Sequence, residues 1–311
     1  MLSARKLLFL APLLFLGSGA AADTDRIEAI SLLGDPLSAS TLPEDFQQKQ
    51  EALLGRATAD LAANPTDPDA LVWVGRRMAY LGRYRDAIEV FSQGIEQHPD
   101  DPRFYRHRGH RWISIRELDK AVADLTHAAV LIAGTPDVVE PDGLPNALGV
   151  PTSTLHSNIY YHLGLAQYLR GDLEGALQTY RSCLGVSANP DMLVATSHWL
   201  YMILRRLGRS AEAELVLEPI HESMEIIENE GYHQLLLMYK GLLTAEELES
   251  SSRESGGVAF PTIGYGIGNW HLYNGRPDRG YRMFEQLLES DSWSAFGFIA
   301  AEAELARQET E

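Results

Sequence analysis

One pattern recurs along this chain about every 34 residues and limits its possible folds more than any other feature. In the segment PDALVWVGRRMAYLGRYRDAIEVFSQGIEQHP, residues 68–99, apolar side chains recur at steps of three and four. This spacing gives each of two helices one apolar face. Gly82 supplies a turn between them. A pair of this kind buries its apolar faces only against neighbouring pairs, so the sequence predicts a stack of antiparallel helix pairs.

Five copies of the pattern share apolar or aromatic positions where helices meet, with glycine or alanine where their backbones approach closely. They lie near residues 68–101, 102–135, 157–190, 194–227 and 261–294. These positions resemble the tetratricopeptide-repeat (TPR) family over most of the chain. The resemblance implies an all-α fold, a right-handed α-solenoid of antiparallel helix pairs. The last stretch also resembles exported bacterial TPR proteins of unknown function.

Segments outside the five copies complete a single predicted solenoid domain, residues 45–311. We expect a polar helix at 45–63 to cover one end of the stack and a helix at 293–307 to close the other. Residues 230–253 predict a degenerate helix pair, in which Thr244 and Glu247 have the spacing of a capping box.

A long loop separates the second and third copies. The stretch GTPDVVEPDGLPNALGVPTST, residues 134–154, is rich in proline and glycine, and the insertion itself covers 136–154. Loops of this length in a compact domain are usually functional or disordered. The sequence favours an ordered flap and leaves a disordered insertion as the alternative.

The N-terminus has the three-part pattern of a secretory signal, which we assign to residues 1–22. Two basic residues precede a short apolar run, and small residues precede Asp23. No cysteine follows the apolar run, so the sequence offers no site for a lipoprotein anchor. We therefore expect a periplasmic or secreted protein that begins with a flexible segment, residues 23–44.

Charge and cysteine content narrow the classes of function. The formal net charge is −17, which makes nucleic acid and anionic lipid poor general partners. Cys183 is the single cysteine, so an intramolecular disulfide is impossible. Its position in the third copy predicts a buried and unreactive thiol.

The first helix of each copy is expected to present a stripe of side chains on the concave side of the solenoid, next to its core face. This stripe is rich in aromatic, arginine and histidine side chains. The candidate ligand-binding residues are Trp73, Arg76, Tyr80, Arg106, His107, His110, Asn158, Tyr161, His162, His198, Trp199, Arg205, Arg206, Tyr265, Asn269 and Tyr273. Arg108 and Arg111 are expected on flanking surfaces instead.

Such a groove suits a protein or peptide partner, bound through acidic side chains or a free C-terminal carboxylate, or a small anionic ligand. The alternative interpretation is that the aromatic residues fill a tightly curved superhelix while the arginines pair with local acids.

Four histidines of the stripe raise a second functional hypothesis, because imidazoles on neighbouring helices bind zinc or copper where they converge. The chain has no metalloenzyme spacing, no Gly-x-Ser-x-Gly elbow and no phosphate-binding glycine loop. The sequence therefore favours a non-enzymatic, exported binding or scaffold protein without a cofactor. A metal-binding or enzymatic protein that uses the histidines is the alternative.

Overall fold

A computed structural model describes residues 26–255 and 259–309 of the protein, so the proposed signal, residues 1–22, lies outside the described residues. The described part contains fourteen helices and a two-stranded antiparallel sheet. No helix within it is long and apolar enough to cross a membrane. The predicted all-α repeat class is confirmed.

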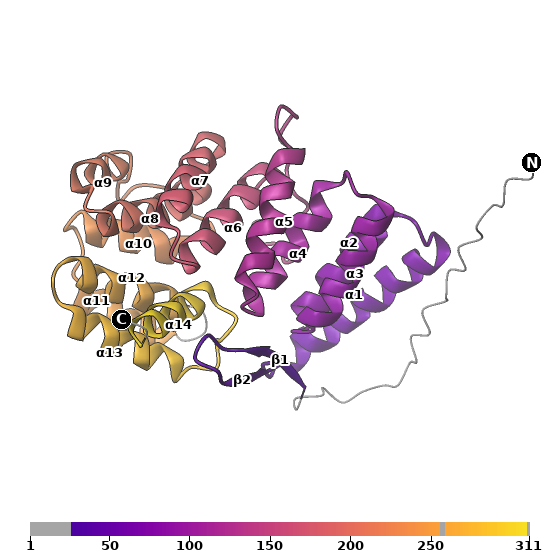
Figure 1. Ribbon diagram of the computed structural model, residues 1–311, viewed down its shortest axis with the longest axis horizontal. Coiled ribbons are helices and arrows are strands. Elements are labelled where there is room, and N and C mark those ends of the chain that lie inside the picture. The colour runs from indigo at the N-terminus through magenta and orange to yellow at the C-terminus, as the bar shows by residue number, and fades with distance from the viewer. Residues whose placement is uncertain (1–25, 256–258, 310–311) are drawn as a thin grey trace, which may run out of the picture.

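The helices pair as the 34-residue period predicts (Figure 1). The five pairs are α2 (Pro68–Tyr80) with α3 (Tyr84–Gln97), α4 (Pro102–Ser114) with α5 (Leu118–Leu131), α6 (Leu155–Leu169) with α7 (Leu173–Val186), α8 (Pro190–Arg206) with α9 (Ser210–Leu217), and α12 (Ala259–Tyr273) with α13 (Pro277–Leu288). The degenerate pair consists of α10 (Glu230–Tyr239) and α11 (Ala245–Ser255), and the flanking helices are α1 (Glu44–Ala63) and α14 (Phe296–Gln308).

Local signals in the sequence explain where these helices begin and turn. Helices α2 and α4 each start at a proline that follows an aspartate, and the side chains of Asp67 and Asp101 accept hydrogen bonds from amides of the first turn. Gly82 adopts φ +74°, a conformation that favours glycine and lets the chain reverse between α2 and α3. The predicted capping box is confirmed, because Thr244 and Glu247 exchange side-chain-to-amide hydrogen bonds.

The helix pairs approach closely where the pattern places small residues. A Cβ atom added at Gly164 would lie 2.7 Å from the ring of Tyr180, so only glycine allows α6 and α7 this separation. Cys183 is fully buried, as predicted, and burial raises the pKa of its thiol to about 11. A thiol with so high a pKa is almost entirely protonated at neutral pH and is a poor nucleophile.

The stack closes on itself, as Figure 1 shows, because the C-terminal helices return beside α6 and α8. The Arg307 guanidinium donates a 2.9 Å hydrogen bond to the carbonyl of Leu169 in α6. In place of the flexible segment expected at 23–44, strands β1 (Ile27–Ile30) and β2 (Pro36–Ser38) form a hairpin. The Trp293 indole donates a 2.8 Å hydrogen bond to the carbonyl of Ser38 in this hairpin. The N-terminal hairpin and the C-terminal helices thus meet.

Candidate functional site

The concave face inferred from the sequence is filled over its C-terminal half. Helix α14 contacts α6 and α12, and Phe296 at its start packs against the rings of His110 and His162, at centroid distances of 5.4 and 5.7 Å. Six candidate ligand-binding residues are buried in this region: Tyr161, His162, His198, Trp199, Tyr265 and Asn269. These six side chains belong to the interior of the closed stack.

Some buried polar groups of this region pair with one another, whereas the Nε2 of His198 and the hydroxyl of Tyr180 have no hydrogen-bond partner among the described residues. The Trp199 indole donates a 2.8 Å hydrogen bond to the hydroxyl of Tyr161, and the Asn269 amide donates a 2.8 Å hydrogen bond to the hydroxyl of Tyr168. Burial alone lowers the pKa of His198 to about 3, so its imidazole is neutral at physiological pH. The arrangement is that of a polar core.

Three further candidates lie at the edge of the filled region. Arg206 forms a 2.9 Å ion pair with Glu304 of α14. The Arg205 guanidinium stacks 4.5 Å from the ring centre of Tyr273 and donates a 3.0 Å hydrogen bond to the side chain of Asn274. The contact of Arg206 fits the alternative interpretation of the sequence, in which arginines of the stripe pair with acidic side chains of the protein itself.

A cavity of about 110 Å³ lies between α2 and α4, in the N-terminal half of the inner face. Five predicted residues line it together: Arg76, Tyr80, Arg106, His107 and His110. Trp73, also predicted, stacks under the Arg76 guanidinium at 4.5 Å. The structure therefore brings the N-terminal members of the predicted set into one site, which we call the arginine cavity.

The expectation that Arg111 lies on a flanking surface is wrong. Arg111 follows His107 by four residues in α4, so the two side chains share a helix face and both line the arginine cavity. Its guanidinium lies 5.2 Å from the ring centre of Tyr84. Arg108 points elsewhere and forms a 2.7 Å ion pair with Asp124 of α5. The spacing of four residues from His107 is the sequence signal that would have placed Arg111 on this face.

Positive charge exceeds negative charge around this cavity. Glu140 is the carboxylate that approaches it, with 3.1 Å to the Nε of Arg106 and 3.6 Å to the Nε2 of His107. Within residues 26–255 and 259–309, no carboxylate lies within ion-pair distance of Arg76, Arg77 or Arg111.

Burial shifts the ionisation of these side chains. It lowers the pKa of Arg111 to about 10, and the positive charge of Arg106 adds to this effect. Burial also holds the pKa values of His107 and His110 well below 6.5, with a further contribution from neighbouring arginines. Both imidazoles are therefore neutral at pH 7, whereas the arginines keep their charge. An anion that enters this site relieves the repulsion among the guanidinium groups.

The long loop at 134–154, which we call the flap, lies beside the arginine cavity, where Glu140 approaches Arg106 and His107. A second space of about 180 Å³ lies beneath it, lined in part by Arg76, Arg106, Glu140 and Asn158. The Asn158 side-chain amide donates a 3.1 Å hydrogen bond to Glu140. Val139 and Thr154 form an isolated β-bridge at the base of the flap. Asp142 of the flap and Glu228 also line this second space, but of these carboxylates it is Glu140 that lies within ion-pair distance of Arg106.

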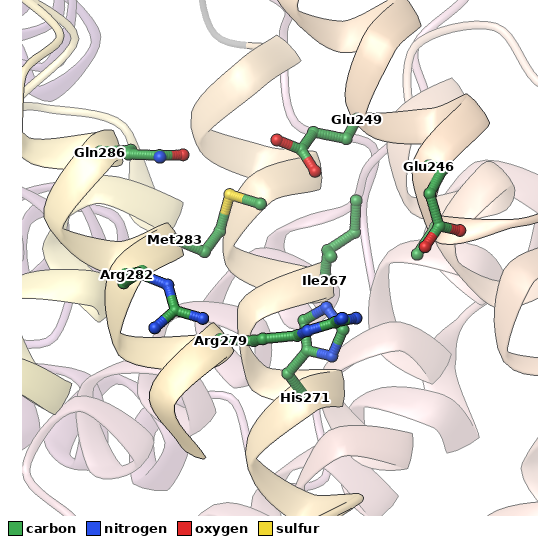
Figure 2. A pocket seen from close by; sticks show the side chains of 9 residues that line it. Glu246, Glu249, Ile267, His271, Arg279, Arg282, Met283 and Gln286 are labelled. Atoms are coloured by element: carbon green, nitrogen blue, oxygen red, sulfur yellow. The ribbon is translucent and has the colours of Figure 1, made fainter. Parts of the chain in front are cut away.

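A third cavity, of about 240 Å³, lies between α11, α12 and α13 and was not identified from the sequence. Figure 2 shows Glu246 and Glu249 on one side and Arg282 on the other, while the side chain of Arg279 extends across His271 between them. Burial lowers the pKa of His271, and both arginine side chains are exposed. Its two carboxylates balance its two guanidinium groups, so this cavity lacks the excess charge of the arginine cavity. The residues come from three helices without a shared motif.

The histidines of the inner face do not form a metal site. The rings of His110 and His162 lie 4.2 Å apart, but His198 stacks on Tyr232 at 4.8 Å. Across the described ranges, no group of three or more histidine, cysteine, aspartate or glutamate residues is placed to hold a metal ion. The metal-binding alternative therefore has no supporting geometry in these ranges.

Comparison with known families identifies the repeats. Tetratricopeptide-repeat models match residues 68–110 and residues 159–185. The chain carries tetratricopeptide repeats. The first TPR match spans α2, α3 and most of α4, and the second spans most of α6 and α7. TPR solenoids in general present extended surfaces to which other proteins bind.

Two curated relatives share part of the repeat region. The chain is 27% identical over 141 residues to the BBSome complex member BBS4 of Bos taurus, covering 45% of this chain and 23% of the relative. It is 25% identical over 133 residues to BBS4 of Xenopus tropicalis, covering 43% of this chain and 22% of the relative. The matches thus span less than a quarter of either relative.

Similar solved structures include other repeat proteins. A tetratricopeptide repeat protein from Parabacteroides merdae has a TM-score of 0.47 at 14% identity, covering 85% of this chain and 98% of that one. YrrB, described as a TPR protein with an unusual peptide-binding site, has a TM-score of 0.43 at 13% identity, covering 81% of this chain and 97% of that one.

Proposed function

We propose that this protein is an exported, non-enzymatic TPR binding or scaffold protein whose arginine cavity holds an anionic group. The group belongs to a protein segment, as an acidic side chain or a C-terminal carboxylate, or to a small anionic ligand. The observation that carries the proposal is the excess of guanidinium groups over carboxylates around the cavity between α2 and α4.

Guanidinium groups that lie close together in the cavity repel one another, which costs free energy. Arg106 and Arg111 lose hydration in the cavity, and burial lowers the pKa of both. Only Arg106 is compensated by a nearby described carboxylate. A ligand carboxylate gains charge-assisted hydrogen bonds from donors that are already held in place by α4. Each such bond contributes about 1.5–3 kcal/mol to binding.

The closed C-terminal half explains why the binding site lies near the N-terminus. Tyr161, Trp199 and Tyr265 are buried, so a partner cannot reach them without opening the stack. The side chains around the arginine cavity instead border an existing space beneath a loop. We therefore place the binding site at α2, α4 and the flap.

Affinity capture from the cell envelope tests the proposal. We expect the variant Arg106→Gln combined with Arg111→Gln to lose the partners that the parent protein retains. The control variant Arg83→Gln combined with Arg170→Gln removes the same charge from half-exposed positions and should retain them. Equal loss of partners in both variants would mean that binding depends on the overall charge. Retention of all partners by the Arg106→Gln and Arg111→Gln variant would contradict the proposed site.

Export is the second part of the proposal and is supported by the signal pattern at residues 1–22. We expect the mature chain to begin at or near Asp23 and to remain in solution without detergent. Mass spectrometry of the purified protein checks both points. A chain that keeps residues 1–22 in the membrane fraction would contradict export as a soluble protein.

A further inference from the structure

The flap places its own acidic side chain, Glu140, against two residues of the arginine cavity, Arg106 and His107. Between residues 133 and 151, only Glu140 and Gly143 are buried. The Glu140 carboxylate lies 3.1 Å from the Nε of Arg106, and its second oxygen lies 3.6 Å from the Nε2 of His107. Asn158 of α6 donates a 3.1 Å hydrogen bond to it. Side chains from α4 and α6 thus surround one carboxylate of the flap.

The main chain of the flap contacts the same face of the solenoid. The Arg76 guanidinium donates a 2.7 Å hydrogen bond to the carbonyl of Pro141, and Arg77 donates a 2.9 Å hydrogen bond to the carbonyl of Gly143. One anchored acidic side chain and two main-chain carbonyls are the groups that an extended peptide offers to a protein surface. The flap therefore occupies its site in the manner of a bound peptide.

Little apolar contact holds the tip of the flap. Leu144, Leu148 and Val150 are 43%, 70% and 46% exposed, so hydrophobic burial contributes little to its position. Polar contacts hold the tip at one further point, where Asn146 donates a 3.0 Å hydrogen bond to Glu228. The flap is therefore attached to the inner face mainly by polar contacts, namely those of the Glu140 side chain and of the Pro141 and Gly143 carbonyls.

Glu140 leaves part of the cavity's hydrogen-bonding capacity unused. The buried Nε of Arg106 has no well-aligned hydrogen-bond acceptor despite its proximity to Glu140. No described carboxylate reaches the guanidinium of Arg111, which also lines the arginine cavity. An external carboxylate that reached both arginines would gain contacts that Glu140 does not make.

We infer that the Glu140 side chain and the carbonyls of Pro141 and Gly143 form an internal ligand. The external ligand is then an extended protein segment with an acidic side chain, which displaces the flap. This inference rests on the proposed function of the arginine cavity. A tethered ligand acts at an effective concentration on the order of millimolar. Acidic segments with low affinity for the site therefore do not displace the flap.

A peptide added in trans tests the inference. The probe is a fluorescein-labelled peptide of sequence VVEPDGLPN, residues 138–146, titrated into purified protein and followed by fluorescence anisotropy. We expect Glu140→Gln to bind it at least about tenfold more tightly than the parent. If the flap fills the site in about nine-tenths of the parent molecules, the apparent affinity of the parent for the peptide is about tenfold weaker than that of an open site. The same peptide with glutamine in place of its glutamate should bind Glu140→Gln at least about tenfold more weakly.

Asp142→Asn is the matched control, because it removes the same charge two residues away. The Asp142 side chain is exposed and accepts a 2.9 Å hydrogen bond from the amide of Leu144. We expect its peptide affinity to stay within about twofold of the parent. Equal peptide affinity for Glu140→Gln and Asp142→Asn would overturn the internal ligand. If envelope capture still required Arg106 and Arg111 in that case, the proposed function would stand without it.

Hydrogen exchange supplies a second measurement that does not depend on the peptide. Amides of residues 142–150 should exchange faster in Glu140→Gln than in the parent and in Asp142→Asn, while the amides of α6 keep their protection. Unchanged exchange in the flap would show that Glu140 does not hold it and would overturn the inference. Loss of protection in α6 as well would attribute the change to unfolding and also count against it.

Discussion

Where α14 closes onto the rest of the stack, buried or half-buried arginines meet carboxylates, whereas the arginines between α2 and α4 outnumber the carboxylates near them. Arg116 forms a 2.7 Å ion pair with Glu302, and Arg206 forms a 2.9 Å ion pair with Glu304. In the arginine cavity, Glu140 approaches Arg106 but no described carboxylate approaches Arg111. We therefore expect the paired arginines around α14 to hold the fold, whereas the proposed function assigns the arginines of the cavity to a partner.

The two regions also differ in how their space is used. Around α14 the interior is filled by aromatic rings, among them Trp199, Tyr168 and Tyr265, which are at most 1% exposed. Between α2 and α4 a space of about 110 Å³ remains. Variants of the first region should therefore change stability, and variants of the second should change binding.

The largest effect is expected where the closure depends on one buried ion pair. Arg116→Ala leaves Glu302, a residue with 1% exposure, without its partner and should lower the free energy of unfolding by about 3–5 kcal/mol. Urea unfolding measures this change. The control Arg181→Ala breaks a pair with Glu212 in which both side chains are 41% exposed, and should cost less than about 1 kcal/mol. Equal costs would mean that the Arg116–Glu302 pair does not stabilise the closure.

A smaller loss of stability should follow from separating α14 and α12. A Cβ atom at Gly297 would overlap the main-chain carbonyl of Pro261, which side-chain movement cannot relieve. We expect Gly297→Ala to cost about 1–3 kcal/mol. Gly185→Ala, in α7, meets no atom within 4 Å and should be neutral or stabilising by up to about 1 kcal/mol. Thermal unfolding of the two variants measures this difference in stability. Equal melting temperatures would contradict a close contact between α14 and α12 at Gly297.

The pH dependence of stability provides a third test of the filled region. The pKa of His198 is about 3 in the folded protein, below the ordinary value of about 6.5, so the unfolded state binds its proton more readily. The stability that this neutral imidazole contributes is fully present above about pH 6.5 and is lost as the pH falls towards 3, by up to about 1.4 kcal/mol per pH unit. Urea unfolding of His198→Phe between pH 7 and pH 4 should show a shallower decline. A slope identical to that of the parent would contradict burial of a neutral His198.

The smallest effect on stability is expected in the arginine cavity. Arg111→Gln removes a charge that no described carboxylate neutralises, so the free energy of unfolding should change by less than about 0.5 kcal/mol. The same change should raise the pKa of His110, because the positive charge of Arg111 contributes to its low value. NMR titration of the histidines measures this shift, and His198 serves as the internal control. A destabilisation as large as that of Arg116→Ala would make Arg111 a structural residue.

The repeat units could be predicted from the sequence because their helices are defined by local periodicity. Prolines at the first helical position, glycines in the turns and small residues at the crossings place the five pairs close to their predicted boundaries. The capping box at Thr244 and the burial of Cys183 follow from the same local rules. Each of these features depends on residues within one repeat or its neighbour.

The predicted binding groove is wrong where residues distant in sequence decide whether a side chain is buried. Tyr161, Trp199 and Tyr265 do lie on the inner side of their helices, but α14 and its neighbours return to cover them. Arg111 was assigned to a flank because the predicted stripe on α4 did not include it, although Arg111 lines the cavity together with His107. The hairpin at residues 27–38 was missed because its partners are distant in sequence, from Arg85, which donates hydrogen bonds to Glu28, 57 residues earlier, to Trp293, which donates one to Ser38.

By itself the sequence determined the helices, their pairing and the inward position of the arginine and aromatic stripe, because these depend on spacings of three, four and 34 residues. Only the tertiary structure decided which of those side chains remain beside open space. That outcome depends on contacts between segments that are far apart in the sequence, such as Arg116 with Glu302 and Leu32 with Glu302. Residue spacing within a repeat carries no information about contacts across 186 or 270 residues.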